Sequence, residues 1–187
     1  MIISIAGDPG SGKTSVARLL SGRLGWPWYS MGDLRGKMAL ERGLTIDELN
    51  QLGETDPATD TAVDDYARRL GETDNNFVIE GRLAWHFIPH SFKVFLSCEH
   101  KEAGRRVYGA KKRDPSRRDE PAYSSPEEAE REIKKRIESD ARRYLKHYGV
   151  VFNDQKNFDL VIDTTAHKKP EQTVEKILAA LKTRRKV

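Results

Sequence analysis

Short blocks of consecutive apolar residues recur along the chain. They lie at residues 2–6, 77–79, 94–96 and 160–162, with a shorter block at 28–29. The blocks are continuous rather than alternating, and the first is rich in β-branched residues, which is typical of strands buried on both faces of a parallel sheet. The pattern therefore predicts a parallel sheet of about five strands.

Between these blocks the apolar residues recur at helical spacing. The predicted helices cover residues 15–24, 33–42, 45–52, 57–70 and 171–181, together with a long helix that begins at Ser125 and Pro126. Thr45 and Glu48 have the spacing of a capping box, and Asp56 is the expected N-cap of the fourth helix. Strands that alternate with helices predict a doubly wound α/β domain with helices on both faces of the sheet.

One stretch breaks this periodicity. Residues 111–126 mix Lys and Arg with Asp and Glu, contain three prolines and show no apolar repeat, so we predict a mobile lid there. The long helix after it carries apolar residues at steps of four, which predicts one buried stripe. That stripe consists of Ala129, Ile133, Ile137, Ala141 and Leu145.

Length and charge limit the class of protein. A chain of 187 residues is long enough for one packed domain, and we expect a single domain over 1–187. Its 33 Lys and Arg against 29 Asp and Glu give a net charge of +4, which suits an anionic ligand. The single cysteine, Cys98, excludes an internal disulfide. No apolar run is long enough for a membrane span, and we expect a cytoplasmic monomer.

The most informative motif directly follows the first predicted strand. Residues 7–14 match the pattern G-x-x-x-x-G-K-[ST], whose glycines let backbone N–H groups point at phosphate oxygens at the start of a helix. Lys13 is expected to bridge the β- and γ-phosphates of ATP, and the Thr14 hydroxyl to bind Mg²⁺. An ordinary strand–turn–helix junction needs the glycines but not Lys13 and Thr14. The predicted donor site comprises Gly7, Asp8, Pro9, Gly10, Ser11, Gly12, Lys13, Thr14 and Ser15.

A phosphate loop occurs in GTPase switches, in assembly ATPases and in small-molecule kinases. Residues 33–36 match a DxxG switch pattern, but they precede the third predicted strand, and the chain has no N-K-x-D sequence to read guanine. Assembly ATPases normally need a longer module. The pattern therefore favours a kinase that transfers the γ-phosphoryl group to a small acceptor.

Phosphoryl transfer requires fixed cations around the reacting phosphates. Arg82 follows a predicted strand at its carboxyl end, where ligands bind in open α/β sheets. Arg136, Asp140 and Arg143 are spaced by four and three, so they share one stripe of the long helix, and Asp140 is expected to hold both guanidinium groups. Surface ion pairs would explain the same spacing, but the phosphate loop and the basic lid favour a catalytic role.

Together these segments resemble the nucleoside monophosphate kinases, and most closely the short form of cytidylate kinase that lacks a large acceptor-binding insertion. The resemblance covers nearly the whole chain. The phosphate loop is shared with many enzymes, whereas the Gly-Asp-x-x-Arg, Glu-Gly-Arg and R-x-x-x-D-x-x-R elements in this order are far more specific. Its elements are residues 7–14, 30–35, 78–83, 136–143 and 158–165 and the helix that carries Asp56, Asp60 and Asp64.

This resemblance implies an activity and its ligands. It implies that Mg²⁺-bound ATP phosphorylates CMP or dCMP to the diphosphate by direct in-line transfer. Arg35 and Arg82, the latter beside Gly81, would hold the α-phosphate of the acceptor, and Asp33 would help to organise Mg²⁺ through water. The acceptor-binding helices would cover residues 33–70.

The resemblance also assigns roles around the donor. Arg136 and Arg143 would close over the transferring phosphoryl group from the lid side. Arg105 or Arg106 would lie against the donor adenine. The opposite wall would comprise Asp163, Thr164 and Thr165.

The choice of acceptor base depends on side chains that read base edges. A carboxylate accepts a hydrogen bond from the N4 amine of cytosine, and Asp60 and Asp64 are one turn apart on the helix after Asp56. The same acids would also stabilise the amino-terminal half of their helix. Because a carboxylate binds the adenine N6 amine equally well, adenylate kinase and dephospho-coenzyme A kinase remain alternatives.

An alternative from another class is a regulatory ATPase that binds RNA or ribosomes. Its basic surfaces would be residues 111–118 and the tail 182–186. Asp114 interrupts the first of these, and Asp119 and Glu120 follow it directly, which fits a hinged lid better than a surface that follows a phosphate backbone. Nucleic acid is therefore not the expected partner.

Overall fold

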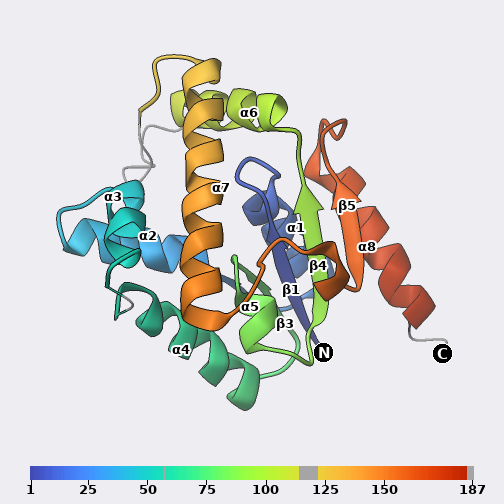
Figure 1. The fold of residues 1–187 in the computed structure, drawn as a ribbon. Coiled ribbons are helices and arrows are strands. Elements are labelled where there is room, and N and C mark those ends of the chain that lie inside the picture. The colour runs from blue at the N-terminus through green and yellow to red at the C-terminus, as the bar shows by residue number, and fades with distance from the viewer. Residues whose placement is uncertain (57, 114–121, 185–187) are drawn as a thin grey trace.

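A parallel sheet forms the centre of the molecule in this computed structural model, which describes residues 1–56, 58–113 and 122–184. The described strands lie in the order β2-β3-β1-β4-β5, and all their pairings are parallel (Figure 1). The predicted α/β class and the five strands are confirmed. Their bounds are Ile2–Gly7 for β1, Trp28–Ser30 for β2, Phe77–Glu80 for β3, Phe92–Ser97 for β4 and Leu160–Asp163 for β5.

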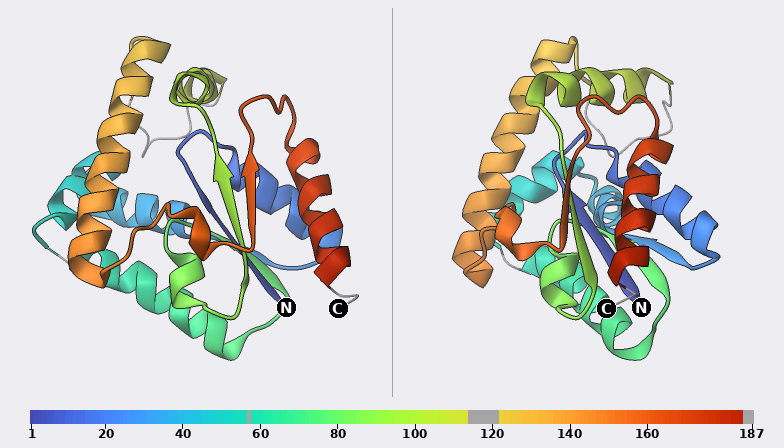
Figure 2. Two further views of the ribbon diagram at one scale, coloured as in Figure 1. Left: turned by 45° about the vertical axis from the view of Figure 1, so that its right-hand side comes forward. Right: turned by 90° about the vertical axis from the view of Figure 1, so that its right-hand side faces the viewer.

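Helices cover both faces of this sheet (Figures 1 and 2). On one face, the apolar side chains of α1 and α8 pack against β1, β3, β4 and β5. On the other face, α2, α4 and α5 pack against β1 and β3. The helices are α1 (Lys13–Leu24), α2 (Met31–Glu41), α3 (Ile46–Gly53), α4 (Ala58–Thr73), α5 (Ala84–Phe87), α6 (His100–Arg113), α7 (Pro126–Tyr148) and α8 (Pro170–Arg184), with a short 3₁₀ turn, η1 (Gln155–Asn157).

Local caps begin two of the helices where the sequence predicts. At α3, the Thr45 hydroxyl accepts from the Glu48 N–H, and the Glu48 carboxylate accepts from the Thr45 N–H, which completes the predicted capping box. At α7, the Ser125 hydroxyl accepts from the Glu128 N–H. Each cap satisfies a backbone donor that the helix itself leaves without a partner.

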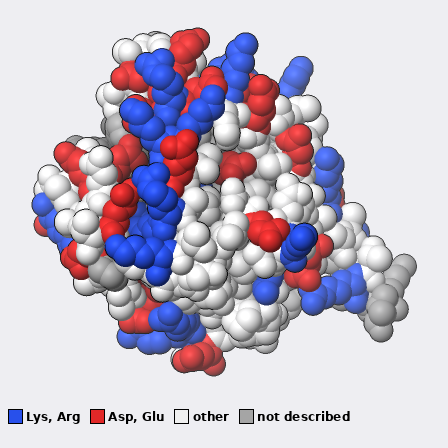
Figure 3. All heavy atoms as spheres, viewed as in Figure 1, with Lys and Arg blue, Asp and Glu red and all other residues white. Residues whose placement is uncertain are grey.

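The long helix α7 runs from α6 down toward α4 (Figures 1 and 2). At its start the two backbones are close, because a Cβ on Gly104 of α6 would lie 2.7 Å from the Pro126 carbonyl oxygen. Its outer face carries both signs of charge (Figure 3), and Lys134 pairs with Glu130 there. In the described part of the chain, no helix is long and apolar enough to cross a membrane.

The buried stripe of α7 does not follow the predicted steps of four to its end. Ala129 and Ile133 are buried, but Leu145 is 56% exposed and Tyr144 is buried in its place. A step of four residues advances about 40° beyond a full helical turn, so several steps rotate a side chain out of the buried face. The prediction was therefore wrong for Leu145.

Candidate active site

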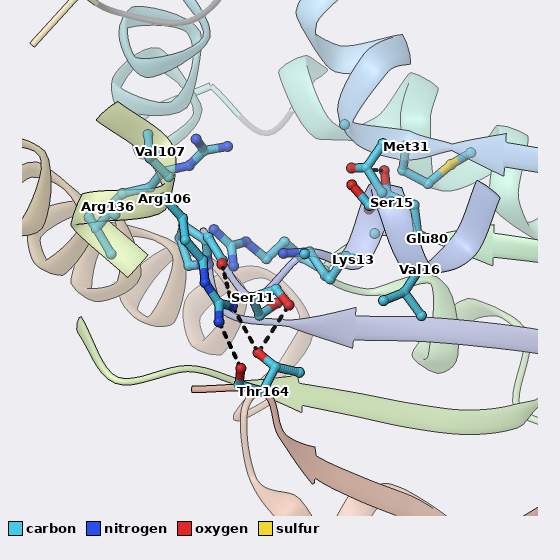
Figure 4. Close-up of a pocket in the computed structure, with 18 of the residues that line it drawn as sticks. Ser11, Lys13, Ser15, Val16, Met31, Glu80, Arg106, Val107, Arg136 and Thr164 are labelled. Atoms are coloured by element: carbon cyan, nitrogen blue, oxygen red, sulfur yellow. Dashed lines mark hydrogen bonds between the residues drawn. The ribbon is translucent and has the colours of Figure 1, made fainter. Parts of the chain in front are cut away.

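A pocket of about 990 Å³ lies where the carboxyl ends of β1 and β3 meet the helices around them. The phosphate loop, α2, α4, α6, α7 and the loop after β5 all contribute to its wall. Figure 4 shows Lys13, Glu80, Arg106, Arg136 and Thr164 around this one space. The volume is at the upper end of the range for small-molecule sites.

The phosphate loop forms the floor of the pocket. Gly10 and Gly12 have φ angles of +76° and +87°, a conformation that glycine adopts without strain. Gly10 also lies so close to α6 that a Cβ there would be 2.8 Å from the Cα of Ala103. The loop residues that line the pocket are Pro9, Gly10, Ser11, Gly12, Lys13, Thr14 and Ser15.

The two remaining residues of the predicted donor site, Gly7 and Asp8, support the loop from below. The Gly7 carbonyl accepts from Arg82 at 3.0 Å, and the Asp8 carboxylate accepts from the Cys98 N–H at 3.3 Å. The Asp8 carbonyl accepts from the Lys13 ammonium at 2.7 Å. Gly7 and Asp8 therefore do not line the pocket themselves. Their carbonyl groups hold the side chains of Arg82 and Lys13, which do.

Lys13 is placed among cations. Burial and the neighbouring Arg82 guanidinium lower the pKa of the Lys13 ammonium to about 7, although Glu80 acts in the opposite direction. An anion in the loop would favour the charged ammonium and raise this pKa. The electrostatics of the loop therefore favour a phosphate ligand.

Glu80 is a site residue that the sequence reasoning missed. It ends β3, is 4% exposed and lies beside Ile5 of β1 in the sheet register. Its carboxylate accepts from the Thr14 hydroxyl at 3.3 Å and from the Ser30 hydroxyl, and the Ser30 oxygen in turn accepts from the Asp33 N–H. An acid at the end of an apolar strand was the available signal.

These oxygen atoms fit a hard divalent cation. Mg²⁺ is usually held by one or two carboxylates together with water and substrate phosphates. Within 1–56, 58–113 and 122–184 there is no group of three or more His, Cys, Asp and Glu side chains that would form a complete metal cage. Thr14, Glu80 and Asp33 together suit Mg²⁺ that arrives with a phosphate.

Arg82 connects three elements at the pocket wall. Its guanidinium donates to the Gly7 carbonyl and forms an ion pair with Asp140 at 2.8 Å. Arg82, Gly81 and Asp140 all line the pocket. The end of β3, the phosphate loop and α7 are thus fixed to one another by a single side chain.

Asp140 does not hold the pair of arginines that the sequence predicts. It contacts Arg143 at 2.8 Å, as predicted, but its second partner is Arg82. Arg136 instead lies 3.9 Å from Asp47 of α3. The prediction was wrong for Arg136 because the spacing of residues along one helix does not show a competing guanidinium from another element, here Arg82 after β3.

Arg143, which is predicted to contact the transferring phosphoryl group, does not face the pocket in this arrangement. The side chain is 1% exposed, donates to the Asn50 carbonyl at 2.8 Å and pairs with Asp60 at 3.0 Å and with Asp140. It lies behind the described pocket lining, whereas Arg136 belongs to it. Burial between two carboxylates makes Arg143 a positioning residue.

Arg35 lines the pocket, and its guanidinium nitrogen atoms have protein partners. Nε donates to the Asn50 side-chain oxygen at 2.8 Å, and Nη1 donates to the Thr59 carbonyl and pairs with Asp60. Asp60 therefore lies between Arg35 and Arg143. This buried network joins α2, α3, α4 and α7, and it neutralises the first of the two predicted base-reading acids.

Asp64, the second of these acids, has a different environment. It lines the pocket near the apolar side chains Val63, Ala67 and Phe87 and accepts a hydrogen bond from the Tyr148 hydroxyl. Burial raises the pKa of the Asp64 carboxyl to about 6. An apolar wall with one convergent polar group is typical of a site for a flat ring.

On the opposite side of the pocket, Arg106 binds the loop after β5. Its Nη2 donates to the carbonyl oxygens of Thr164, Thr165 and His167 at 2.8, 3.1 and 3.0 Å, and Nη1 lies 3.4 Å from the Gly10 carbonyl oxygen. The Thr164 hydroxyl is 3.1 Å from the Ser11 carbonyl oxygen (Figure 4). Arg106 thereby joins α6, the phosphate loop and this loop.

Asp163 differs from the prediction. It lies outside the described pocket lining, and its exposed carboxylate accepts from the N–H and hydroxyl of Thr165. The short turn after β5 directs Thr164 and Thr165 toward the pocket and leaves Asp163 outside it. The predicted wall is therefore corrected to Thr164 and Thr165.

The lid prediction lies only partly within the described residues. Residues 114–121 lie outside them, as do the side chains of 111–113. On either side of this gap, Ala110 and Tyr123 line the pocket. The lid over residues 111–126 stays a prediction.

Sequence comparison finds a family and several relatives. The model of the cytidylate kinase-like family matches residues 2–166. The chain is 39% identical over 164 residues to cytidylate kinase of Methanothrix thermoacetophila, covering 88% of each chain. It is 35% identical over 164 residues to cytidylate kinase of Methanothermobacter thermautotrophicus, covering 88% of this chain and 95% of that relative.

Comparison with solved structures concerns the fold alone at these low identities. Shikimate kinase from Aquifex aeolicus has a TM-score of 0.60 at 21% identity, with 98% of each chain covered. An uncharacterized protein from Eubacterium ventriosum has a TM-score of 0.68 at 18% identity, with 96% of each chain covered. The fold is therefore that of the phosphate-loop kinases.

Proposed function

The chain belongs to the cytidylate kinase-like family, and we propose that it transfers the γ-phosphoryl group of ATP to CMP or dCMP. The observation that carries this proposal is the composition of the pocket. Lys13 of the phosphate loop, Arg82 and Arg136 line the same pocket as Asp64, and two phosphate groups would meet among these cations. A loose, anionic transition state is stabilised by fixed cations of this kind.

The donor is ATP bound with its phosphates in the loop of residues 7–15. The planar face of the Arg106 guanidinium suits the adenine ring, because the hydrogen bonds of Arg106 lie in the plane of the group and leave its faces open. Thr164 and Thr165 form the opposite wall. Arg105 is 72% exposed on its side chain and pairs with Glu102, so we assign the adenine contact to Arg106.

Mg²⁺ would be held by the Thr14 hydroxyl and the Glu80 carboxylate, with Asp33, which also lines the pocket, acting through water. The bound ion would supply neutralisation of the negative charge on the donor phosphates. The protein part of this site is prepared by the hydrogen bonds of Glu80 to Thr14 and Ser30. Glu80 is added here to the predicted metal residues.

The acceptor lies between α2, α4 and the end of β3. Arg82 and Arg35 lie on the phosphate side, although Arg35 must exchange one of its protein partners to reach a ligand. The ring lies against Val63, Ala67 and Phe87, and the Asp64 carboxylate accepts from the N4 amine of cytosine. Asp60 is assigned a positioning role because two arginines already pair with it.

Transfer is direct and in line. Lys13 and Arg136 stabilise the charge that develops on the transferring group, while Asp140 and Arg143 hold Arg82 and the acceptor helices in place. Closure of residues 111–126 would exclude water, which otherwise competes as acceptor. The family favours CMP over the AMP, dephospho-coenzyme A and RNA-binding alternatives. The cytoplasmic location and the monomeric state remain predictions.

An ADP-release assay over CMP, dCMP, UMP, AMP, shikimate and dephospho-coenzyme A tests this function. We expect the highest kcat/KM with CMP or dCMP. A preference for AMP, or for shikimate, would replace the proposed acceptor while leaving the phosphate-loop chemistry in place. Release of ADP that no acceptor stimulates would contradict a small-molecule kinase altogether.

A further inference from the structure

The two acids of α4 that face the acceptor differ in their partners. Asp60 pairs with Arg35 and Arg143, whereas within 1–56, 58–113 and 122–184 no Lys or Arg forms an ion pair with Asp64. The side chain that binds Asp64 is Tyr148, whose hydroxyl donates to Oδ2. Asp64 therefore keeps its acceptor capacity for a ligand.

Tyr148 is outside the described pocket lining, and its ring is fixed by aromatic neighbours. Its centroid lies 5.5 Å from that of Phe87 at an interplanar angle of 82°, and 6.3 Å from that of Tyr144. Tyr148 is also the last residue of α7, which ends at Gly149 in the left-handed conformation. The hydroxyl consequently has a defined direction toward α4.

We infer that Tyr148 positions the Asp64 carboxylate and thereby sets the preference for an acceptor base with an amine at C4 over one with a carbonyl. This inference rests on the proposed function. Tyr148 occupies Oδ2, so Oδ1 is the oxygen left for the ligand, and an ionised carboxylate can only accept. The N4 amine of cytosine donates, whereas O4 of uracil is an acceptor and meets the same oxygen with repulsion.

The charged and titratable groups around Asp64 come from three helices. They are Tyr148 on α7, Asp60 and Arg68 on α4 and Arg35 on α2. Burial and the Asp64 contact raise the pKa of the Tyr148 hydroxyl, so it stays protonated and remains the donor. Loss of this donor would raise the pKa of Asp64, because the hydrogen bond favours the carboxylate.

The first test compares Tyr148→Phe with the matched control Tyr66→Phe. Both changes remove one hydroxyl, and Tyr66 lies on α4 outside the described pocket lining, packed against Tyr29. For Tyr148→Phe we expect about a fivefold weaker Kd for CMP by titration calorimetry, as for one lost hydrogen bond of about 1 kcal/mol. The Kd for UMP should not weaken, and KM for CMP should rise more than kcat falls. Equal changes for CMP and UMP, or an unchanged ratio of the two, would overturn the inference.

A second test separates positioning from general packing. If Tyr148 acts through Asp64, Tyr148→Phe should leave the CMP:UMP ratio unchanged in an Asp64→Asn background. In the wild-type background, the acid limb of kcat/KM for CMP should move to higher pH. The positioning role is contradicted if Tyr148→Phe still changes the CMP:UMP ratio in the Asp64→Asn background. It is also contradicted if the acid limb of kcat/KM for CMP does not move in the wild-type background. A wild-type protein that does not phosphorylate CMP refutes the proposed function instead, so the two failures are distinguishable.

Discussion

The proposed donor side and the proposed acceptor side of the pocket are built from different parts of the chain. The donor side consists mainly of backbone groups, namely the phosphate loop and the carbonyl oxygens of Thr164, Thr165 and His167, which Arg106 binds. The acceptor side consists of buried side-chain ion pairs among Arg35, Asp60, Asp140 and Arg143, contributed by three helices. The first is specified by a short sequence motif, and the second only by the assembled fold.

The strongest way to break the acceptor side is Arg143→Met. This change leaves Asp60 and Asp140 each without one buried cation, so the free energy of unfolding should fall by about 3–5 kcal/mol. Urea denaturation measures it. The matched control Arg142→Met removes an exposed arginine that pairs with Glu54 and should cost no more than about 1 kcal/mol. Equal losses for the two variants would mean that the buried ion-pair network stabilises the fold no more than an exposed ion pair does.

Disruption of the donor side should reduce turnover without destabilising the fold. Lys13→Met removes the ammonium from the phosphate loop, and we expect kcat to fall on the order of a thousandfold, as for other groups that stabilise a transferring phosphoryl group. Because burial depresses the pKa of Lys13, its loss should not destabilise the protein. Steady-state kinetics and thermal unfolding test the two halves of this prediction. Near-normal turnover would exclude the role given to Lys13.

On the acceptor side, Asp64→Asn should change the stability of the protein in a way that depends on pH. The folded pKa of about 6 exceeds the ordinary value of 3.8, so the contribution of Asp64 to stability is full below pH 4 and is lost as the pH rises through 6. Replacement by Asn should therefore stabilise the protein by about 1–3 kcal/mol at pH 7.5 and by much less at pH 4. Denaturation at both pH values measures it. For the exposed neighbour, Asp65→Asn, we expect no such difference, and a pH-independent gain for Asp64→Asn would contradict the buried carboxylate.

The smallest effect is expected at the donor wall. Arg106→Lys keeps a positive charge but loses the guanidinium hydrogen bonds to the carbonyl oxygens of the loop after β5. We therefore expect KM for ATP to rise about tenfold. The neighbouring Arg105→Lys alters an exposed residue bound to Glu102 and should change KM by about twofold or less. Initial rates at saturating CMP test both. The reverse order would assign the adenine contact to Arg105.

Local patterns predicted the parts of the molecule that local forces determine. The five strands, the phosphate loop and the Thr45–Glu48 capping box each depend on residues a few positions apart. The partner of Asp140 did not follow from the same reasoning, because Arg82 reaches it from another element. Sequence spacing likewise gave no reason to separate Asp60 from Asp64.

Glu80 combines a local signal with one that only the fold supplies. Its position at the end of a buried strand was visible in the sequence, but its importance depends on the pairing of β3 beside β1, which brings it to Thr14. Asp163 shows the opposite error, since a residue within a matching segment is turned away from the pocket by the backbone after β5. Membership of a motif indicates the neighbourhood of a side chain and not its direction.

The contact between Gly10 and Ala103 also has a consequence for motion. Because the phosphate loop touches the backbone of α6 with no room for a Cβ, the first turn of this helix is anchored to the loop. A rigid swing of the whole helix would break that contact, so any hinge for the residues that follow must lie beyond Ala103. A displacement of the phosphate loop would therefore also displace the amino-terminal end of α6.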